Sequence, residues 1–189
     1  MNRIEYNHLR FGNGQTIESD NGTNTTSTPT NYLQYSNSDL DMRIKYPDNW
    51  VYTEYIPFIP NDDIHAKFIP SSEVSFLDNL TASTDVKVII GKQVDLPYDN
   101  MPLDLYFDYV KKLQTNGGFN ITNTGKTNMS DGNPAYELVS SNKDIPVKSV
   151  TVIMNKFPES YFFIYEATPE KFNTYLPIAQ EMYKTLFIN

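Results

Sequence analysis

The sequence lacks cysteine altogether and has only two histidines, His8 and His65, among its 189 residues. The missing cysteines exclude disulfides, zinc-thiolate sites and thiol catalysis, and they leave the redox compartment open. A Ser-His-Asp arrangement needs a histidine as its base, and no G-x-S-x-G motif supplies the serine. The glycine-rich nucleotide-binding motifs and H-E-x-x-H are missing as well. We therefore predict no catalytic residue, no organic cofactor and no enzymatic activity.

Long apolar runs and a surplus of basic residues are also missing. No apolar run approaches the roughly 18 residues of a membrane span, which predicts no direct membrane insertion by this chain. Residues 1–30 have no apolar signal-peptide core, so we expect any leader or anchor to have been removed. The formal net charge of −8 disfavours a nucleic-acid partner and anionic membranes. A divalent cation or a basic protein partner is electrostatically compatible with it.

Aromatic residues, in contrast, are abundant. The chain has 14 tyrosines and 11 phenylalanines, which favours a sheet-rich domain. Its one tryptophan, Trp50, follows a short strand and Pro47, so we expect its ring to close one end of a core. Residues 13–30 contain one aliphatic residue among polar types, which predicts a flexible Asn/Thr-rich linker. The domain is expected at residues 31–189, and the role of residues 1–12 stays open.

Five Asn-x-Ser/Thr sequences bear on the compartment, at Asn21, Asn24, Asn79, Asn120 and Asn128. Each is a possible N-glycosylation site in an exported protein. Two of them lie in the linker, whose composition is typical of a solvated stalk. We therefore expect the protein to be extracellular or to lie at the cell surface.

Apolar periodicity predicts mainly strands. Residues 32–37 and 42–46 should form a hairpin in which Arg43 and Lys45 occupy the polar face. Further strands are expected at 51–55, 74–77, 86–91, 119–126, 135–141, 147–155 and 161–167. Three prolines between residues 56 and 73 predict a long irregular loop there.

Two helices complete the expected fold. The first has an apolar face formed by Leu103, Tyr106, Phe107, Val110 and Leu113, and it ends at Gly117-Gly118. The second should begin with a short turn after Thr168-Pro169 and restart at Pro177. The expected class is α+β, with a central antiparallel β-sheet flanked by helices.

One cluster is a candidate metal site. Asp62, Asp63 and His65 lie within four residues, and two carboxylates with one imidazole suit a divalent cation such as zinc, manganese or calcium. The alternative is a solvated acidic loop. Calorimetric titration with zinc or manganese, with His65→Ala as the control, distinguishes the two, because equal heats would remove the metal site.

A second group of acidic residues surrounds the start of the first helix, at Asp95, Asp99, Asp104 and Asp108. The helix dipole favours carboxylates at this end, which is a sufficient structural explanation. A calcium site there is the remote alternative.

The order of several motifs resembles the PsbP-like domain family, named after an extrinsic subunit of photosystem II. The resemblance covers Tyr32 to Asn189 and rests on Y-P-x-x-W in MRIKYPDNW, on DGNPAYELVSS and on the closing IAQEMYKTLF. It implies an α/β/α sandwich with a central antiparallel sheet. The polar stalk is similar to secreted archaeal members. The photosynthetic member docks on a membrane complex, and many relatives are non-enzymatic accessory proteins.

These observations lead to one main hypothesis and two alternatives. The main hypothesis is an exported, non-catalytic PsbP-like domain that binds a protein partner or a membrane complex. The first alternative is a divalent-metal- or small-ligand-binding protein that uses the loop at residues 56–70. The second is a hydrolase with an unrecognised site, which a broad substrate screen would test.

Overall fold

A computed structural model describes residues 29, 31–55, 64–74, 85–93, 101–142, 144–156 and 159–189. These residues form strands, two α-helices and one short 3-10 helix. The elements are β1 (Tyr32–Asn37), β2 (Met42–Pro47), β3 (Trp50–Tyr55), β4 (Ile64–Pro70), η1 (Ser71–Glu73), β5 (Val86–Gln93), α1 (Leu103–Asn116), β6 (Phe119–Asn128), β7 (Pro134–Asn142), β8 (Val147–Lys156), β9 (Glu159–Ala167), α2 (Pro169–Lys184) and β10 (Phe187–Ile188).

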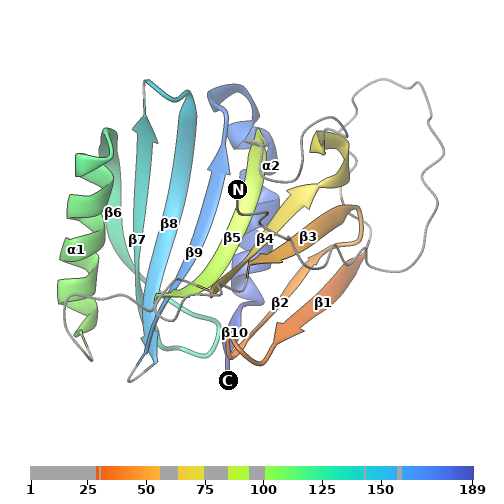
Figure 1. Cartoon of the computed structure of the whole chain (residues 1–189), viewed down its shortest axis with the longest axis horizontal. Coiled ribbons are helices and arrows are strands. Elements are labelled where there is room, and N and C mark those ends of the chain that lie inside the picture. Colours follow the sequence, from red (N-terminus) through yellow and green to blue (C-terminus); the bar gives the residue numbers. More distant parts are fainter. Residues whose placement is uncertain are drawn as a thin grey trace, which may run out of the picture.

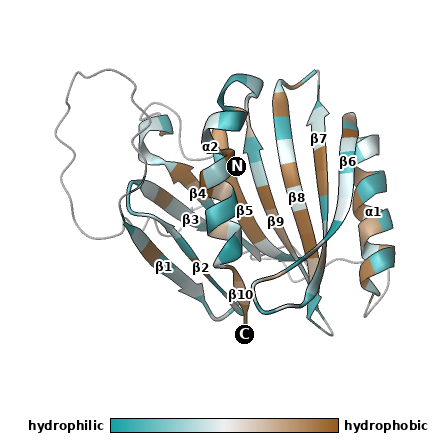
Figure 2. Cartoon of the chain, turned by 180° about the vertical axis from the view of Figure 1, so that it is seen from behind, coloured by the Kyte–Doolittle hydropathy of each residue, from teal (hydrophilic) through white to brown (hydrophobic). Residues whose placement is uncertain are grey.

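The strands form two antiparallel sheets (Figure 1). The large sheet has the order β3-β4-β5-β9-β8-β7-β6, and the small sheet has the order β1-β2-β10. Strand β5 pairs with β9, so the first and second halves of the chain meet in the middle of the large sheet. The helix α1 lies on one face of the large sheet, and α2 lies on the other (Figures 1 and 2). This arrangement confirms the expected α+β class with an antiparallel sheet flanked by helices.

The main core lies between the large sheet, α2 and the small sheet. Strand side chains alternate between the two faces of a sheet, so Val152 and Met154 of β8 enter this core while Ile153 enters the other. The helix α2 contributes Phe172, Tyr175, Ala179 and Met182. In Figure 2 the central strands β5, β9 and β8, which lie next to α2, show hydrophobic bands along their length.

An aromatic cluster joins the small sheet to β3 and β4. It consists of Tyr35, Tyr46, Tyr52 and Phe68, whose neighbouring ring centroids lie 5.0 to 6.0 Å apart. Next to it Trp50 is only 3% exposed and meets Tyr175 edge-on at 6.2 Å. The expectation that Trp50 packs into the core is therefore confirmed.

The opposite face of the large sheet carries a smaller core under α1. Its buried members are Met101, Tyr106, Phe107, Leu138 and Ile153. The expected apolar face of α1 is wrong at Leu113, which is 48% exposed. Gln114 faces the sheet in its place, where its Oε1 accepts from Ser140 at 2.6 Å and its Nε2 donates to Thr151 at 3.0 Å. Because Ser140 and Thr151 on the sheet need hydrogen-bond partners, a polar side chain is favoured at position 114 of the helix.

The predicted loop at residues 56–73 is wrong in part, because β4 occupies residues 64–70. Ala66 and Phe68 are fully buried in the main core, and His65 and Lys67 alternate with them. The alternation of inward and outward side chains in β4 is hard to recognise in the sequence, because one of the two inward residues is the small Ala66. Pro70 is tolerated because it is the last residue of the strand.

The predicted restart at Pro177 is also wrong, since α2 is one helix with Pro177 inside it. An internal proline costs about 3 kcal/mol. Packing of Tyr175, Ala179 and Met182 on the main core offsets this cost on both sides of the proline. Beyond the helix, Phe187 and Ile188 form β10, the third strand of the small sheet.

Several predictions lie outside the described residues: the segment 1–12, nearly all of the linker, and the strand at 74–77 apart from Val74, which is not in a strand. Within the described part of the chain, no helix is long and apolar enough to span a membrane.

Candidate functional site

The structure describes only one of the three predicted metal ligands. Asp62 and Asp63 lie outside the described residues, whereas His65 belongs to β4 and lies opposite Gly91 of β5 in the register. The expectation that His65 is a loop residue is therefore wrong. Among the described residues, no group of three or more His, Cys, Asp or Glu side chains is arranged to hold a metal ion. A site that includes Asp62 and Asp63 stays a prediction.

The acidic residues near α1 are only partly described, because Asp95 and Asp99 lie outside the described residues. Asp104, in the first turn of the helix, accepts a hydrogen bond from the hydroxyl of Tyr136. Asp108 pairs with Lys111 at 2.7 Å, and this bond holds the pKa of Asp108 below its usual range. The two described carboxylates thus have structural partners.

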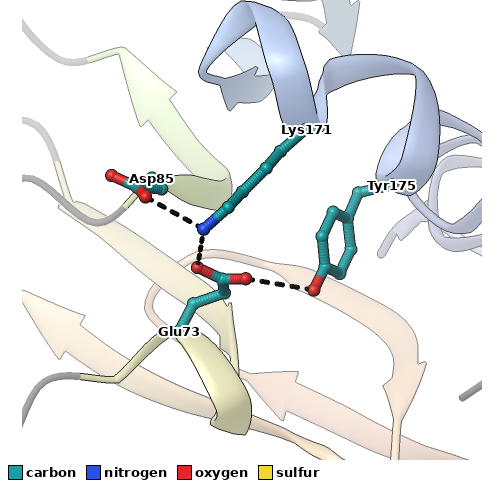
Figure 3. A network of polar contacts seen from close by, with 4 residues as sticks. All are labelled: Glu73, Asp85, Lys171 and Tyr175. Carbon is teal, nitrogen blue, oxygen red and sulfur yellow. Dashed lines mark hydrogen bonds and ion pairs between the residues drawn. The ribbon is translucent and has the colours of Figure 1, made fainter. Parts of the chain in front are cut away.

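A network of four polar side chains lies at the start of α2, and we call it the α2 anchor: Glu73, Asp85, Lys171 and Tyr175 (Figure 3). Lys171, in the first turn of the helix, donates to Oδ2 of Asp85 at 2.9 Å and to Oε2 of Glu73. Tyr175, one turn later, donates to Oε1 of Glu73 at 3.2 Å. Glu73 ends η1, which follows β4, and Asp85 directly precedes β5, so the anchor ties α2 to segments next to two strands of the large sheet.

The protonation states of the anchor favour a structural role. Partial burial disfavours the charge on Lys171, but the hydrogen bonds to Glu73 and Asp85 outweigh it and raise its pKa. Burial raises the pKa of Tyr175 as well. A lysine or tyrosine that acts as a base or nucleophile near neutral pH needs a lowered pKa. Lys171 therefore stays a cation and Tyr175 stays neutral, and the anchor holds a helix in place.

Replacing Lys171 by methionine is expected to lower the free energy of unfolding by about 1–2 kcal/mol, because the carboxylate of Glu73 loses its cation. The side chain of Glu73 is only 12% exposed, so water replaces this partner poorly. The matched control is Lys184→Met, whose ion pair with Glu181 lies in solvent at 66% and 57% exposure. It should cost less than about 0.5 kcal/mol. Urea unfolding measures both values, and equal losses would contradict the role assigned to the anchor.

Sequence reasoning missed the anchor because its members lie far apart in the chain. Lys171 is 98 positions from Glu73 and 86 from Asp85. One signal was present in the sequence: Lys171 is a cation in the first turn of a helix, where the helix dipole disfavours it. Such a lysine needs nearby acids, but the sequence does not show which acids provide them.

Comparison with known proteins bears on the fold. No protein-family model matches the sequence, and no curated protein matches it either. Among solved structures, cyanobacterial PsbP (CyanoP) from Synechocystis sp. PCC 6803 is similar with a TM-score of 0.57 and 11% identity, over 89% of this chain and 98% of that one. The Saccharomyces cerevisiae Ran-binding protein Mog1p is similar with a TM-score of 0.50 and 10% identity, over 84% and 95% of the two chains. Protein PA94 from Pseudomonas aeruginosa has a TM-score of 0.50 and 12% identity, over 84% and 97%.

The fold is that of PsbP and Mog1. At this level of identity the likeness establishes the fold alone. The resemblance to PsbP-like domains that the sequence motifs indicated is thus confirmed for the architecture. Membership among secreted archaeal proteins stays a prediction.

Proposed function

We propose that this chain is a non-catalytic module that binds another protein, and that it works as an accessory domain outside the cell or at the cell surface. The observation that carries the proposal is the likeness in fold, over most of both chains, to Mog1p, a Ran-binding protein. The same fold in CyanoP adds support for an accessory role.

The state of the ionisable groups supports a binding role over a catalytic one. Tyr35 donates to Oε1 of Glu54 at 2.8 Å, and Tyr161 donates to Oε2 of Glu159 at 2.7 Å. Burial and these carboxylates raise the pKa of both tyrosines. The hydroxyls of these tyrosines, like that of Tyr175 in the α2 anchor, donate to carboxylates that hold the fold together. Their raised pKa values make them poor proton donors or acceptors near neutral pH.

The placement at the cell surface rests on the linker composition and the Asn-x-Ser/Thr sequences. Of these asparagines, Asn120 and Asn128 are described, and both are exposed on β6. An exposed acceptor is a requirement for glycosylation, so their position supports the proposal. Protease treatment of intact cells tests it, because a surface protein should be degraded while the cells stay whole.

Binding is tested by cross-linking the tagged chain in cells of its own source and identifying the captured proteins. The same protein should appear in independent captures. The purified candidate should then bind the purified chain in calorimetry with a defined stoichiometry. A matched capture with an unrelated acidic protein of similar size removes nonspecific candidates. If no purified candidate binds, the proposed function is wrong.

A further inference from the structure

The outer face of the small sheet differs in charge from the rest of the protein. Its side chains that point away from the core are Tyr32, Gln34 and Ser36 of β1, Arg43 and Lys45 of β2, and Phe187 of β10. We call this set the basic face. All members except the half-buried Phe187 are exposed, and none is acidic, in a chain of net charge −8.

Arg43 and Lys45 stand side by side on this face without ion pairs among the described residues. They are two residues apart on one strand, so their side chains share a face and repel each other. Arg43 lies 4.1 Å above the ring of Phe187, and Lys156 approaches the same ring from a distance of 5.9 Å. Arginine beside an exposed tyrosine and a half-buried phenylalanine is a composition typical of protein interfaces.

Among the described residues, no strand pairs with the outer edge of β1. Strand β1 ends the order β1-β2-β10 and lies at the outer border of the molecule in Figure 1. Natural edge strands are usually blocked by a charge, a proline, a bulge or short length. The edge strand β6 has a bulge between Ile121 and Asn123, and β10 has only two residues. The sequence of β1, YLQYSN, has no charge or proline, and its register with β2 is unbroken.

The backbone groups of β1 that point outward can be assigned. Asp48 N donates to the carbonyl oxygen of Asn31, and Lys45 N donates away from β1, to Oγ1 of Thr185. Antiparallel pairs alternate along the strand, so the N–H and C=O groups of Tyr32, Gln34 and Ser36 point away from β2. These are the residues whose side chains lie on the basic face.

We propose that an extended acidic segment of a partner protein adds to β1 as a fourth strand of the small sheet, with its carboxylates bound by Arg43 and Lys45. Strands lie about 4.8 Å apart, so the added strand would run about 10 Å from β2. Arg43 and Lys45 lie opposite the neutral Ser36 and Gln34 of β1. To bind the added strand, the Arg43 side chain would turn from the ring of Phe187 on β10 toward β1. Arginine binds carboxylates in a bidentate manner, and the open edge supplies main-chain hydrogen bonds. The proposal rests on the proposed function and names its surface.

An acidic protein segment fits these observations better than a nucleic acid or an anionic membrane. Those polyanions present long arrays of charge, and they would meet the negative field of the whole chain. A short segment needs only the two cations of the basic face and the edge of β1. The net charge alone is compatible with a basic partner, whereas the local arrangement of the basic face favours an acidic segment.

The test uses the full chain and a labelled, end-capped peptide of about ten alternating glutamate and threonine residues, a length that covers one strand. Fluorescence anisotropy should show binding that weakens about fivefold when salt rises from about 0.05 to about 0.3 M. The double variant Arg43→Glu/Lys45→Glu should bind about tenfold more weakly or worse. The matched control Lys111→Glu/Lys112→Glu makes the same charge change on α1 and should leave the affinity unchanged. A peptide methylated on alternate backbone nitrogens should not bind, because it cannot pair with β1.

Equal weakening by both double variants would overturn the proposal, and so would equal binding of the methylated peptide. Tighter binding to phosphatidylglycerol vesicles or to single-stranded RNA would also overturn it. Binding of the captured partner distinguishes a failure of the proposed surface from a failure of the proposed function. If it binds the wild-type chain and the Arg43→Glu/Lys45→Glu variant equally, the surface is wrong and the proposed function stands. If no partner binds the wild-type chain, the proposed function itself fails.

Discussion

Raising the pH from about 7 to about 11 is expected to lower the free energy of unfolding by about 4 kcal/mol, a large part of the stability of a typical domain. The cause is the burial of three tyrosines. Tyr35, Tyr161 and Tyr165 are only 3%, 2% and 0% exposed. Burial raises the pKa of all three, and nearby carboxylates raise it further for Tyr35 and Tyr161.

The sign follows from the two states of the chain. In the unfolded chain these tyrosines lose their protons near their ordinary pKa of about 10. In the folded chain they keep them, because the pKa is raised. The stability is therefore fully present below about pH 10 and is lost as the pH rises toward the folded pKa values. Each tyrosine contributes about 1.4 kcal/mol per pH unit in that window.

Other groups titrate in the same range, among them Tyr32, Tyr46 and Tyr175, whose pKa burial also raises. Burial raises the pKa of Tyr183 to about 12, and the raised pKa of Lys171 acts in the same direction. Lys67 acts in the opposite direction, because burial and the neighbouring Lys87 lower its pKa. The protonated form of Lys67 is disfavoured in the folded state, so its penalty disappears as the pH rises. One lysine does not cancel three buried tyrosines, and the net change stays a loss.

Urea unfolding at a series of pH values, followed by circular dichroism, measures this loss. The variant Tyr165→Phe should lose about 1 kcal/mol at neutral pH, because the bond from its hydroxyl to the carbonyl of Phe172 is removed. Its further loss up to about pH 11 should be about 1.4 kcal/mol smaller than that of the wild type. The matched control is Tyr32→Phe, at a side chain that is 38% exposed. An unchanged alkaline loss in Tyr165→Phe would contradict the explanation.

The substitution with the largest expected effect is Phe68→Ala. The ring is 0% exposed and meets Tyr35 at 5.4 Å and Tyr46 at 5.2 Å, both from the small sheet. Removing it leaves a cavity between the two sheets. We expect the free energy of unfolding to fall by about 3–5 kcal/mol, which combines lost burial with the cavity term.

The matched control is Phe187→Ala, the same change on the half-buried ring of the basic face. Phe187 is covered only in part, so its loss should be below about 1.5 kcal/mol, including the contact with Arg43. Chemical denaturation of both variants measures the difference. Similar losses would show that the aromatic cluster does not join the sheets as described.

Much of the architecture could be predicted from local patterns. The run from Phe119 to Ala167 was predicted as four antiparallel strands, because each has apolar residues and the intervening turns are short. The hairpin of β1 and β2 followed from the alternation of Met42, Ile44 and Tyr46 with charged residues. These features depend on neighbours within a few residues, which is the range over which sequence patterns report structure.

Features that depend on distant contacts could not be predicted. The strand β4 was missed, since its pairing with β3 and β5 outweighs the nearby prolines. The continuity of α2 through Pro177 depends on packing against the main core. Local propensity favoured a loop at residues 64–70 and a helix break at Pro177. Tertiary contacts overrode both preferences.

By itself, the sequence determined the α+β class, the alternation that places Arg43 and Lys45 on one face, and the absence of a recognised catalytic motif. Each of these follows from residue type and short-range spacing. Only the tertiary structure decided that β2 lies between the edge strand β1 and Phe187 of β10, and that Lys171 meets Glu73 and Asp85. Those contacts join residues dozens of positions apart, and burial of the core, which no local pattern encodes, brings them together.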